Sequence, residues 1–87
     1  MPRGDTDEAI LIEQAKYGDH EAFNELYTRH DSQVYRFIRR RTDNDTDAQH
    51  IAQDTRINVW QEMQTYNPVR RSFLTFVKFW ASIIRLH

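Results

Sequence analysis

The chain has 87 residues, enough for one domain with a thin core, because a domain of this size buries only about 60–65% of the surface its unfolded chain exposes. It contains no cysteine, which excludes disulfides and thiolate metal sites. The net charge of −1 hides an asymmetry: residues 1–62 hold 13 acids and eight Lys or Arg, whereas residues 63–87 hold four Lys or Arg and no acid. We therefore expect the two parts to contact different partners.

Only two glycines and two prolines occur and no segment alternates with period two, so the sequence predicts an all-α fold. The first helix is expected from about Thr6 to Tyr17, with Thr6 as N-cap and Gly18 ending it. The second should begin after the N-cap Asp19 and reach about Arg41. Its core stripe repeats at three- and four-residue spacing and consists of Phe23, Leu26, Tyr27, His30, Val34, Phe37 and Ile38.

A polar run at residues 42–46 separates this helix from a third, for which Thr46 and Gln49 form a capping-box pattern. The third helix should reach about Met63 and pack through Ala48, Ile51, Ala52, Thr55 and Val59. Pro68 predicts a loop over residues 66–70.

The fourth helix should begin at the N-cap Ser72 and remain helical to His87. Its apolar face consists of Phe73, Phe76, Val77, Trp80, Ile83 and Ile84. Because no stop signal follows, we expect that the natural chain continues beyond His87 or was cut within this helix. The four segments together predict a compact bundle of about four helices.

Catalysis and metal binding find little support in the sequence. Glycine-rich phosphate loops, a cysteine nucleophile and a serine in a glycine-flanked elbow are all missing. The four histidines are scattered, and His30 on the core stripe is expected to be a hydrogen-bonded core residue rather than a ligand. We expect no enzyme and no cofactor. The polar N-terminus and the lack of an apolar run of about 20 residues predict a cytoplasmic protein without membrane association.

The outward face of the third helix is the first candidate interface. Stepping 100° per residue away from the core stripe gathers His50, Gln53, Asp54, Ile57, Trp60 and Gln61, with Asp47 nearby. An isoleucine and a tryptophan among acids and amides suggest a protein interface. The alternative is that Trp60 folds over the core edge and Ile57 is an ordinary exposed apolar residue.

The basic segment is the second candidate. Thr75, Lys78, Ser82 and Arg85 lie opposite the core of the fourth helix, and Phe79 borders them. With Arg70 and Arg71 of the preceding loop, the cations suffice for about four phosphates, a log–log salt slope on the order of −3 for single strands. The alternative is a solvated helix face. Arg36, Arg39 and Arg40 form a second basic patch, which the helix dipole also explains.

The order of motifs resembles region 2 of extracytoplasmic-function (ECF) sigma factors. Residues 11–19, residues 21–27 and Val34-Tyr35-Arg36 resemble the opening of that region. Asp47-Ala48, Gln53-Asp54-Thr55 and Val59-Trp60 look like its clamp-binding helix. Tyr66-Asn-Pro68 with Ser72-Phe73 resembles its lead into promoter recognition.

The resemblance implies a transcription initiation factor domain that binds the clamp helices of the largest catalytic subunit of bacterial RNA polymerase. It also implies recognition and melting of the promoter minus-ten element through the non-template strand, and suggests an anti-sigma factor as a further partner. The implied polymerase-binding residues are Asp47, His50, Gln53, Asp54, Ile57, Trp60 and Gln61. The implied DNA-binding residues are Arg70, Arg71, Ser72, Thr75, Lys78, Phe79, Ser82 and Arg85.

Several positions depart from the family pattern. His50 stands where an acid is common, and Phe76 replaces a frequent tryptophan. Ser82 and Ile83 stand where the family often has Arg and Asn, so the residue that reads the unpaired base is not transferable. The helix-turn-helix domain that reads the minus-thirty-five element has no counterpart among these residues, so we expect the chain to be one domain of a two-domain factor or an atypical member of the family. The alternative function is a helical protein-interaction adaptor with no DNA role.

Overall fold

In the computed structural model, which describes residues 7–84, the chain folds into helices and no strand is found in that range. The elements are α1 (Glu8–Lys16), α2 (His20–Arg39), α3 (Asp45–Gln61), the short 3-10 helix η2 (Met63–Thr65) and α4 (Phe73–Ile83). Among these helices none has both the length and the apolar character that crossing a membrane requires. The predicted all-α bundle is confirmed.

The first two helices begin at aspartates that cap them. The carboxylate of Asp7 accepts a hydrogen bond of 2.9 Å from the backbone N–H of Ala9, so Asp7, and not the predicted Thr6, is the N-cap of α1. Thr6 itself lies outside the described residues. Asp19 caps α2 as predicted, through a bond of 3.1 Å from the N–H of Ala22.

Gly18 ends α1 in the left-handed conformation, with a φ of 96°. Its N–H bonds the carbonyl of Ala15, and the next N–H, that of Asp19, reaches back to the carbonyl of Gln14. These two bonds are those of a Schellman motif, in which a residue without a Cβ carries the reversal. The turn directs the chain from α1 straight into α2.

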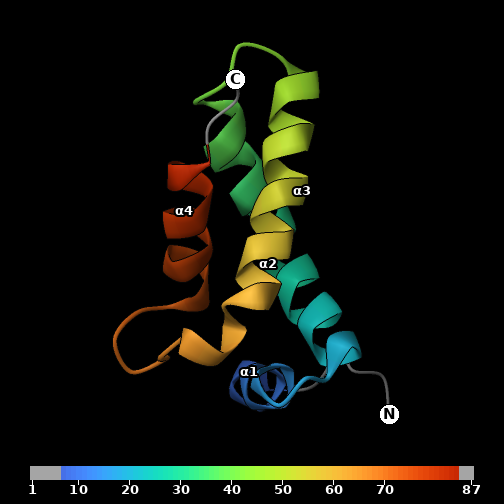
Figure 1. The fold of residues 1–87 in the computed structure, drawn as a ribbon, viewed down its shortest axis with the longest axis vertical. Coiled ribbons are helices and arrows are strands. Elements are labelled where there is room, and N and C mark those ends of the chain that lie inside the picture. The colour runs from blue at the N-terminus through green and yellow to red at the C-terminus, as the bar shows by residue number, and fades with distance from the viewer. Residues whose placement is uncertain (1–6, 85–87) are drawn as a thin grey trace.

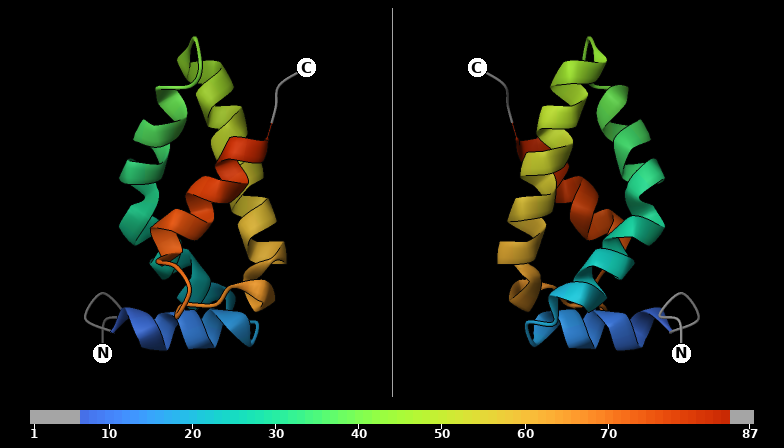
Figure 2. Two further views of the ribbon diagram at one scale, coloured as in Figure 1. Left: turned by 90° about the vertical axis from the view of Figure 1, so that its left-hand side faces the viewer. Right: turned by 90° about the vertical axis from the view of Figure 1, so that its right-hand side faces the viewer.

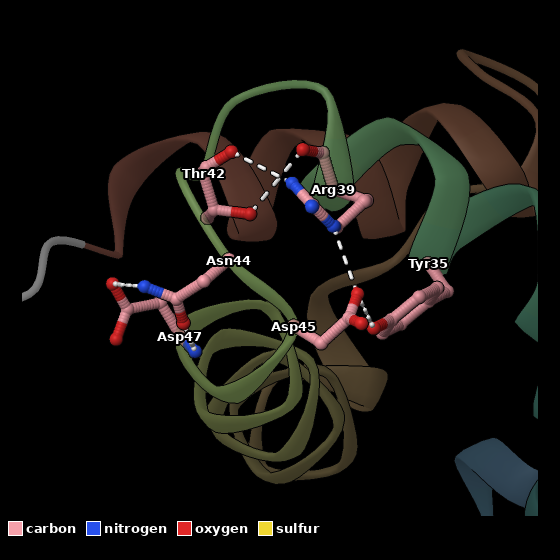
Figure 3. Close-up of polar contacts among 6 residues, drawn as sticks. All are labelled: Tyr35, Arg39, Thr42, Asn44, Asp45 and Asp47. Atoms are coloured by element: carbon pink, nitrogen blue, oxygen red, sulfur yellow. Dashed lines mark hydrogen bonds and ion pairs between the residues drawn. The ribbon is translucent and has the colours of Figure 1, made fainter.

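The start of α3 lies two residues earlier than predicted. Asn44 is the N-cap, because its side-chain oxygen accepts a 2.8 Å hydrogen bond from the N–H of Asp47 (Figure 3). The predicted cap Thr46 is an exposed residue inside the first turn. Asp45 and Asp47 then fall in that turn, where their negative charges interact favourably with the positive end of the helix dipole.

Ser72 caps α4 as predicted, accepting a 3.2 Å hydrogen bond from the N–H of Thr75. The helix ends at Ile83, since Ile84 is extended with a φ of −79° and a ψ of 130°. The prediction that helix continues to His87 is therefore wrong at Ile84, and residues 85–87 lie outside the described range. Ile83, predicted for the core face, is 49% exposed.

Three helices stand side by side and α1 lies across one end of them. α2 and α3 form an inverted V that is joined at the apex by the 40–44 turn, and α4 crosses between them (Figures 1 and 2). α1 lies across the open end, against α2 and η2. The core fills the space between the helices and includes Leu11, Phe23, Leu26, Tyr27, Val34, Ile38, Val59, Met63, Tyr66, Phe73 and Val77.

His30 is hydrogen-bonded, as predicted, but it lies at the edge of the core and its side chain is 21% exposed. Its Nε2 lies 2.8 Å from a carboxylate oxygen of Glu8, and its ring centroid lies 5.7 Å from that of Phe73. The contact joins α1, α2 and α4. Within residues 7–84 no group of three or more His, Cys, Asp or Glu side chains is arranged to hold a metal ion.

The cap assignment is testable by substitution. Asn44→Ala should lower the free energy of unfolding by about 1 kcal/mol, because the N–H of Asp47 loses its acceptor. Urea unfolding followed by circular dichroism measures the change. Thr46→Ala is the matched control and should cost less than about 0.5 kcal/mol, since alanine is favourable inside a helix. A larger loss for Thr46→Ala than for Asn44→Ala would contradict the assignment.

Candidate functional site

The outer face of α3 presents exposed polar side chains around one isoleucine. His50, Gln53, Asp54, Ile57 and Gln61 lie on one side of the helix, and Ile57 is 49% exposed. Within the described part of the chain, no hydrogen bond or ion pair ties the four polar side chains to other residues. Five of the seven residues predicted for a protein interface are thus together and available to a partner.

The other two residues of that prediction belong to the fold. Trp60 is partly buried, with its ring centroid 5.0 Å from that of Phe23 and 4.7 Å, edge-on, from that of His20. Trp60 therefore folds over the edge of the core, as the alternative to a protein interface predicted. Asp47 accepts a 3.2 Å hydrogen bond from the side-chain amide of the cap Asn44 (Figure 3).

The loop before α4 is held at both ends by Tyr66, which is 2% exposed. Its hydroxyl donates a 2.9 Å hydrogen bond to the carbonyl of Arg71, and its own carbonyl accepts one from the ammonium of Lys16 in α1. Burial and then the charge of Glu8 raise the pKa of the Tyr66 hydroxyl, so it remains a donor to a higher pH than a free tyrosine would. Asn67 adds a turn inside the loop by accepting from the N–H of Val69 at 2.9 Å.

This anchored loop and α4 enclose a shallow pocket of about 280 Å³. Its lining consists of Thr65, Asn67, Arg70, Arg71, Phe76, Phe79 and Trp80. Phe79 is 46% exposed, and the guanidinium carbon of Arg71 lies 5.8 Å from its ring centroid. A half-exposed ring beside two arginines can stack a flat ring and attract a phosphate.

Trp80 is one of four lining residues, with Thr65, Asn67 and Phe76, that the sequence did not assign to DNA binding. Its ring packs edge-on against Phe79, with 5.3 Å between centroids. The indole N–H is shielded from solvent and has no hydrogen-bond acceptor among residues 7–84. The periodicity placed Trp80 on the core face, where it does pack in part. The sequence did contain one indication of this role. A tryptophan on a buried face carries an indole N–H that needs a hydrogen-bond acceptor.

The remaining residues predicted for DNA binding are spread over three places. Ser72 and Thr75 hydrogen-bond each other at the start of α4, and the hydroxyl of Ser82 donates to the carbonyl of Phe79 at 2.7 Å. Lys78 points toward α2, with its ammonium 5.4 Å from the ring centroid of Phe37. Arg85 lies outside the described residues.

The second basic patch of the sequence contains one neutralised arginine. Arg39 donates from Nε to Asp45 at 2.9 Å and from a terminal nitrogen to the carbonyl of Thr42 at 3.0 Å (Figure 3). Tyr35 donates to the same Asp45, and desolvation followed by that carboxylate raises the pKa of its hydroxyl. Arg39 therefore fastens the turn between α2 and α3. Its neighbours Arg36 and Arg40 remain exposed.

The family of the chain follows from a comparison with known protein families. Residues 26–82 match the family model of sigma-70 region 2, a range that runs from the second turn of α2 almost to the end of α4. The chain belongs to the sigma-70 region 2 family. Membership gives this sigma region 2 domain a role in transcription initiation, with core RNA polymerase and promoter DNA as its partners, and the family is one of non-catalytic transcription factor domains. Comparisons with curated proteins and with solved structures gave no significant match.

The position of Trp60 in the sigma region 2 domain predicts a stability difference along α3. Trp60→Ala should lower the free energy of unfolding by about 2–3 kcal/mol, because it removes contacts with Phe23 and His20. Ile57→Ala, three residues away on the exposed face, should cost less than about 1 kcal/mol. Urea titrations monitored at 222 nm compare the two. Equal losses would mean that Trp60 is not part of the packed edge.

Proposed function

We propose that the domain is region 2 of an ECF-type sigma factor that works in the bacterial cytoplasm. In this proposal the outer face of α3 binds the clamp helices of the largest catalytic subunit of RNA polymerase. The loop over residues 66–72 and α4 capture the non-template strand of the promoter minus-ten element. The observation that carries the proposal is the family match combined with two exposed surfaces of different chemistry on two adjacent helices.

The character of the α3 surface supports a basic protein partner. Gln53 and Asp54 lie at its centre, exposed and without an intramolecular partner among the described residues. The segment from Asp43 to Glu62 holds five acids and one basic residue, Arg56, which is turned inward. The Arg56 guanidinium hydrogen-bonds Asn24 and lies 5.1 Å from the Tyr27 ring centroid. Arg56 therefore does not offset the charge of Asp54 on the outer face, while Asp45 at the start of α3 is paired with Arg39 of α2.

The pocket beside α4 supports capture of unpaired bases. A base stacked on an aromatic ring contributes about 1–3 kcal/mol, which offsets an unstacking cost of a few kcal/mol per base. Phe79 offers a half-exposed ring, and Arg70 and Arg71 lie beside it for the phosphates. In this mechanism, melting is driven by binding free energy and needs no catalytic group.

Ser82 and Ile83 depart from the family pattern, and we therefore assign base recognition to residues of this pocket. Ser82 donates its hydroxyl to the helix backbone, and Ile83 has no polar atom in its side chain. Neither is equipped to replace the Arg and Asn that the family often carries there. We assign base contact to Phe79, Trp80 and Arg71, which share the lining of one pocket. At His50, the expected clamp contact changes from an acid to an imidazole.

The polymerase contact is tested by the double variant Gln53→Ala with Asp54→Arg. It should abolish binding of the chain to core RNA polymerase, measured by native gel shift or biolayer interferometry, while the circular dichroism spectrum stays unchanged. The control is Gln64→Ala with Glu13→Arg, which makes similar changes at exposed positions on η2 and α1. Retained binding by the first variant would refute the assignment of α3.

The DNA contact is tested with Phe79→Ala in the complex of the chain with core polymerase. Capture of a fluorescent single-stranded minus-ten oligonucleotide should weaken roughly tenfold, because a stacked ring contributes about 1–3 kcal/mol. Ile10→Ala removes an equally exposed apolar side chain from α1 and should have no effect. An adaptor without a DNA role predicts that neither substitution changes capture.

A further inference from the structure

A hollow of about 550 Å³ lies between α1 and the segment that leads from η2 into the loop before α4. Its lining includes the apolar residues Ile12, Tyr17 and Pro68 and the polar residues Glu13, Lys16 and Gln64. A hollow of this volume has room for several side chains of a binding partner. It shares no lining residue with the pocket beside Phe79 or with the outer face of α3. We call it the α1 hollow, and the proposed function does not use it.

α1 carries apolar side chains on its outer side as well as on the side that packs in the core. Ile10 is 49% exposed and Tyr17 is 84% exposed. Because about two helical turns separate them, they lie on the same side of the helix. Among the described elements only α2 and η2 pack against α1, and no described helix lies on its outer side (Figure 2).

The loop adds a third apolar side chain next to the hollow. Val69, the neighbour of the lining residue Pro68, is 92% exposed. A single exposed apolar residue is ordinary in a folded protein, but several that surround a hollow are typical of a surface that binds another protein.

The charge of this end of the domain favours a basic partner. Residues 7–25 hold six acids, one Lys and no Arg. The one Lys is Lys16, whose ammonium donates to the carbonyl of Tyr66 and is therefore directed toward the loop. The carboxylate of Glu13 is exposed and makes no hydrogen bond or ion pair with other residues of the described range. An apolar surface with such a carboxylate at its centre attracts a segment that carries a cation.

Two other occupants fit this surface poorly. DNA would bring phosphates to an acidic end of the domain, where they would be repelled. A second copy of the chain, bound by two-fold symmetry through the outer side of α1, would bring the two copies of Glu13 together, because Glu13 lies between Ile10 and Tyr17 along the helix. Like charges that face each other across an interface oppose association.

We propose that the α1 hollow binds an amphipathic segment of another protein. In this arrangement a Lys or Arg of the segment pairs with Glu13, and aliphatic or aromatic side chains enter the hollow and cover Ile10 and Tyr17. The inference goes beyond the proposed function and does not rest on it, since these residues belong to neither the α3 face nor the pocket beside Phe79. α1 also precedes residue 26, where the family match begins, so family membership does not account for its outer side.

The test selects binders from a display library of random peptides of about 12 residues. The full chain is the bait, and peptides that also bind the double variant Glu13→Lys with Tyr17→Ser are removed. The remaining peptides should combine Lys or Arg with aliphatic or aromatic residues. One of them, labelled with fluorescein, is then titrated with the chain by fluorescence anisotropy. Glu13→Lys and Tyr17→Ser should each weaken its binding about tenfold, the first by charge repulsion and the second by loss of the exposed ring.

The matched controls make the same kinds of change at exposed positions away from α1. Asp43→Lys alters the turn between α2 and α3, at the opposite end of the domain, and Ile83→Ser alters the end of α4 (Figure 2). Each should change the affinity less than about twofold. A peptide whose Lys or Arg residues are replaced by Glu should bind the Glu13→Lys chain better than the unchanged chain. This reversal distinguishes a direct charge pair from a general effect on folding, which circular dichroism monitors.

Four results would overturn the proposal. They are a selection that yields no peptide, selected peptides rich in acids, binding of the charge-reversed peptide that is no better to the Glu13→Lys chain, and concentration-dependent dimers of the unchanged chain that the double variant abolishes. The last result would identify a second copy as the occupant. Binding to core RNA polymerase is measured on the same double variant and should be retained. Its loss would assign the α1 hollow to the polymerase interface and would also contradict a separate partner.

Discussion

Phe73, the first residue of α4, packs its ring against Tyr27 and His30 of α2 and against Tyr66 at the start of the loop. It is 1% exposed. This contact fixes where α4 begins relative to α2 and so sets the positions of both the loop and the exposed rings on α4. The pocket beside Phe79 depends on it, because most of the pocket lining comes from the loop and from α4. The face of α3 is positioned through Val59 and Thr55, which are buried on the opposite side of that helix.

The charge asymmetry of the sequence is expressed in the fold as a division between faces rather than between halves. On α3, Asp54 lies on the outer side and Asp45 is paired with Arg39 of α2, while the single arginine in that helix is turned inward onto Asn24 and Tyr27. Lys78 of the C-terminal segment lines one hollow together with Arg36 and Arg40, which belong to the acidic part of the sequence. A domain that connects a polymerase to a promoter requires such separation, because opposite charges placed side by side would neutralise each other.

Local signals in the sequence were sufficient wherever the structure is decided locally. Asp19, Gly18 and Ser72 were predicted as helix boundaries because a cap or a left-handed turn depends on a few consecutive residues. Asn44 and Thr46 both have cap-forming side chains, and the choice between them depends on the contacts of the turn with Arg39, which spacing does not reveal. Trp60 and Lys78 were uncertain for a similar reason. Helical periodicity predicts which side of its own helix a residue occupies, but it does not predict which residues of a second helix it will contact. Trp60 and Lys78 both contact rings of α2.

The anchoring of the loop by Tyr66 has a consequence for how DNA would be met. Because Lys16 holds one end and the Tyr66 hydroxyl holds the other, the loop is ordered before any strand arrives. Binding to a preformed loop does not carry the entropic cost of ordering that loop. A larger part of the interaction free energy of each contact therefore contributes to the binding affinity. Lys16 belongs to α1, which precedes the segment that matches the family. The first helix therefore supports the loop before α4, and a substitution at Lys16 would alter the loop that we propose binds promoter DNA without itself contacting the DNA.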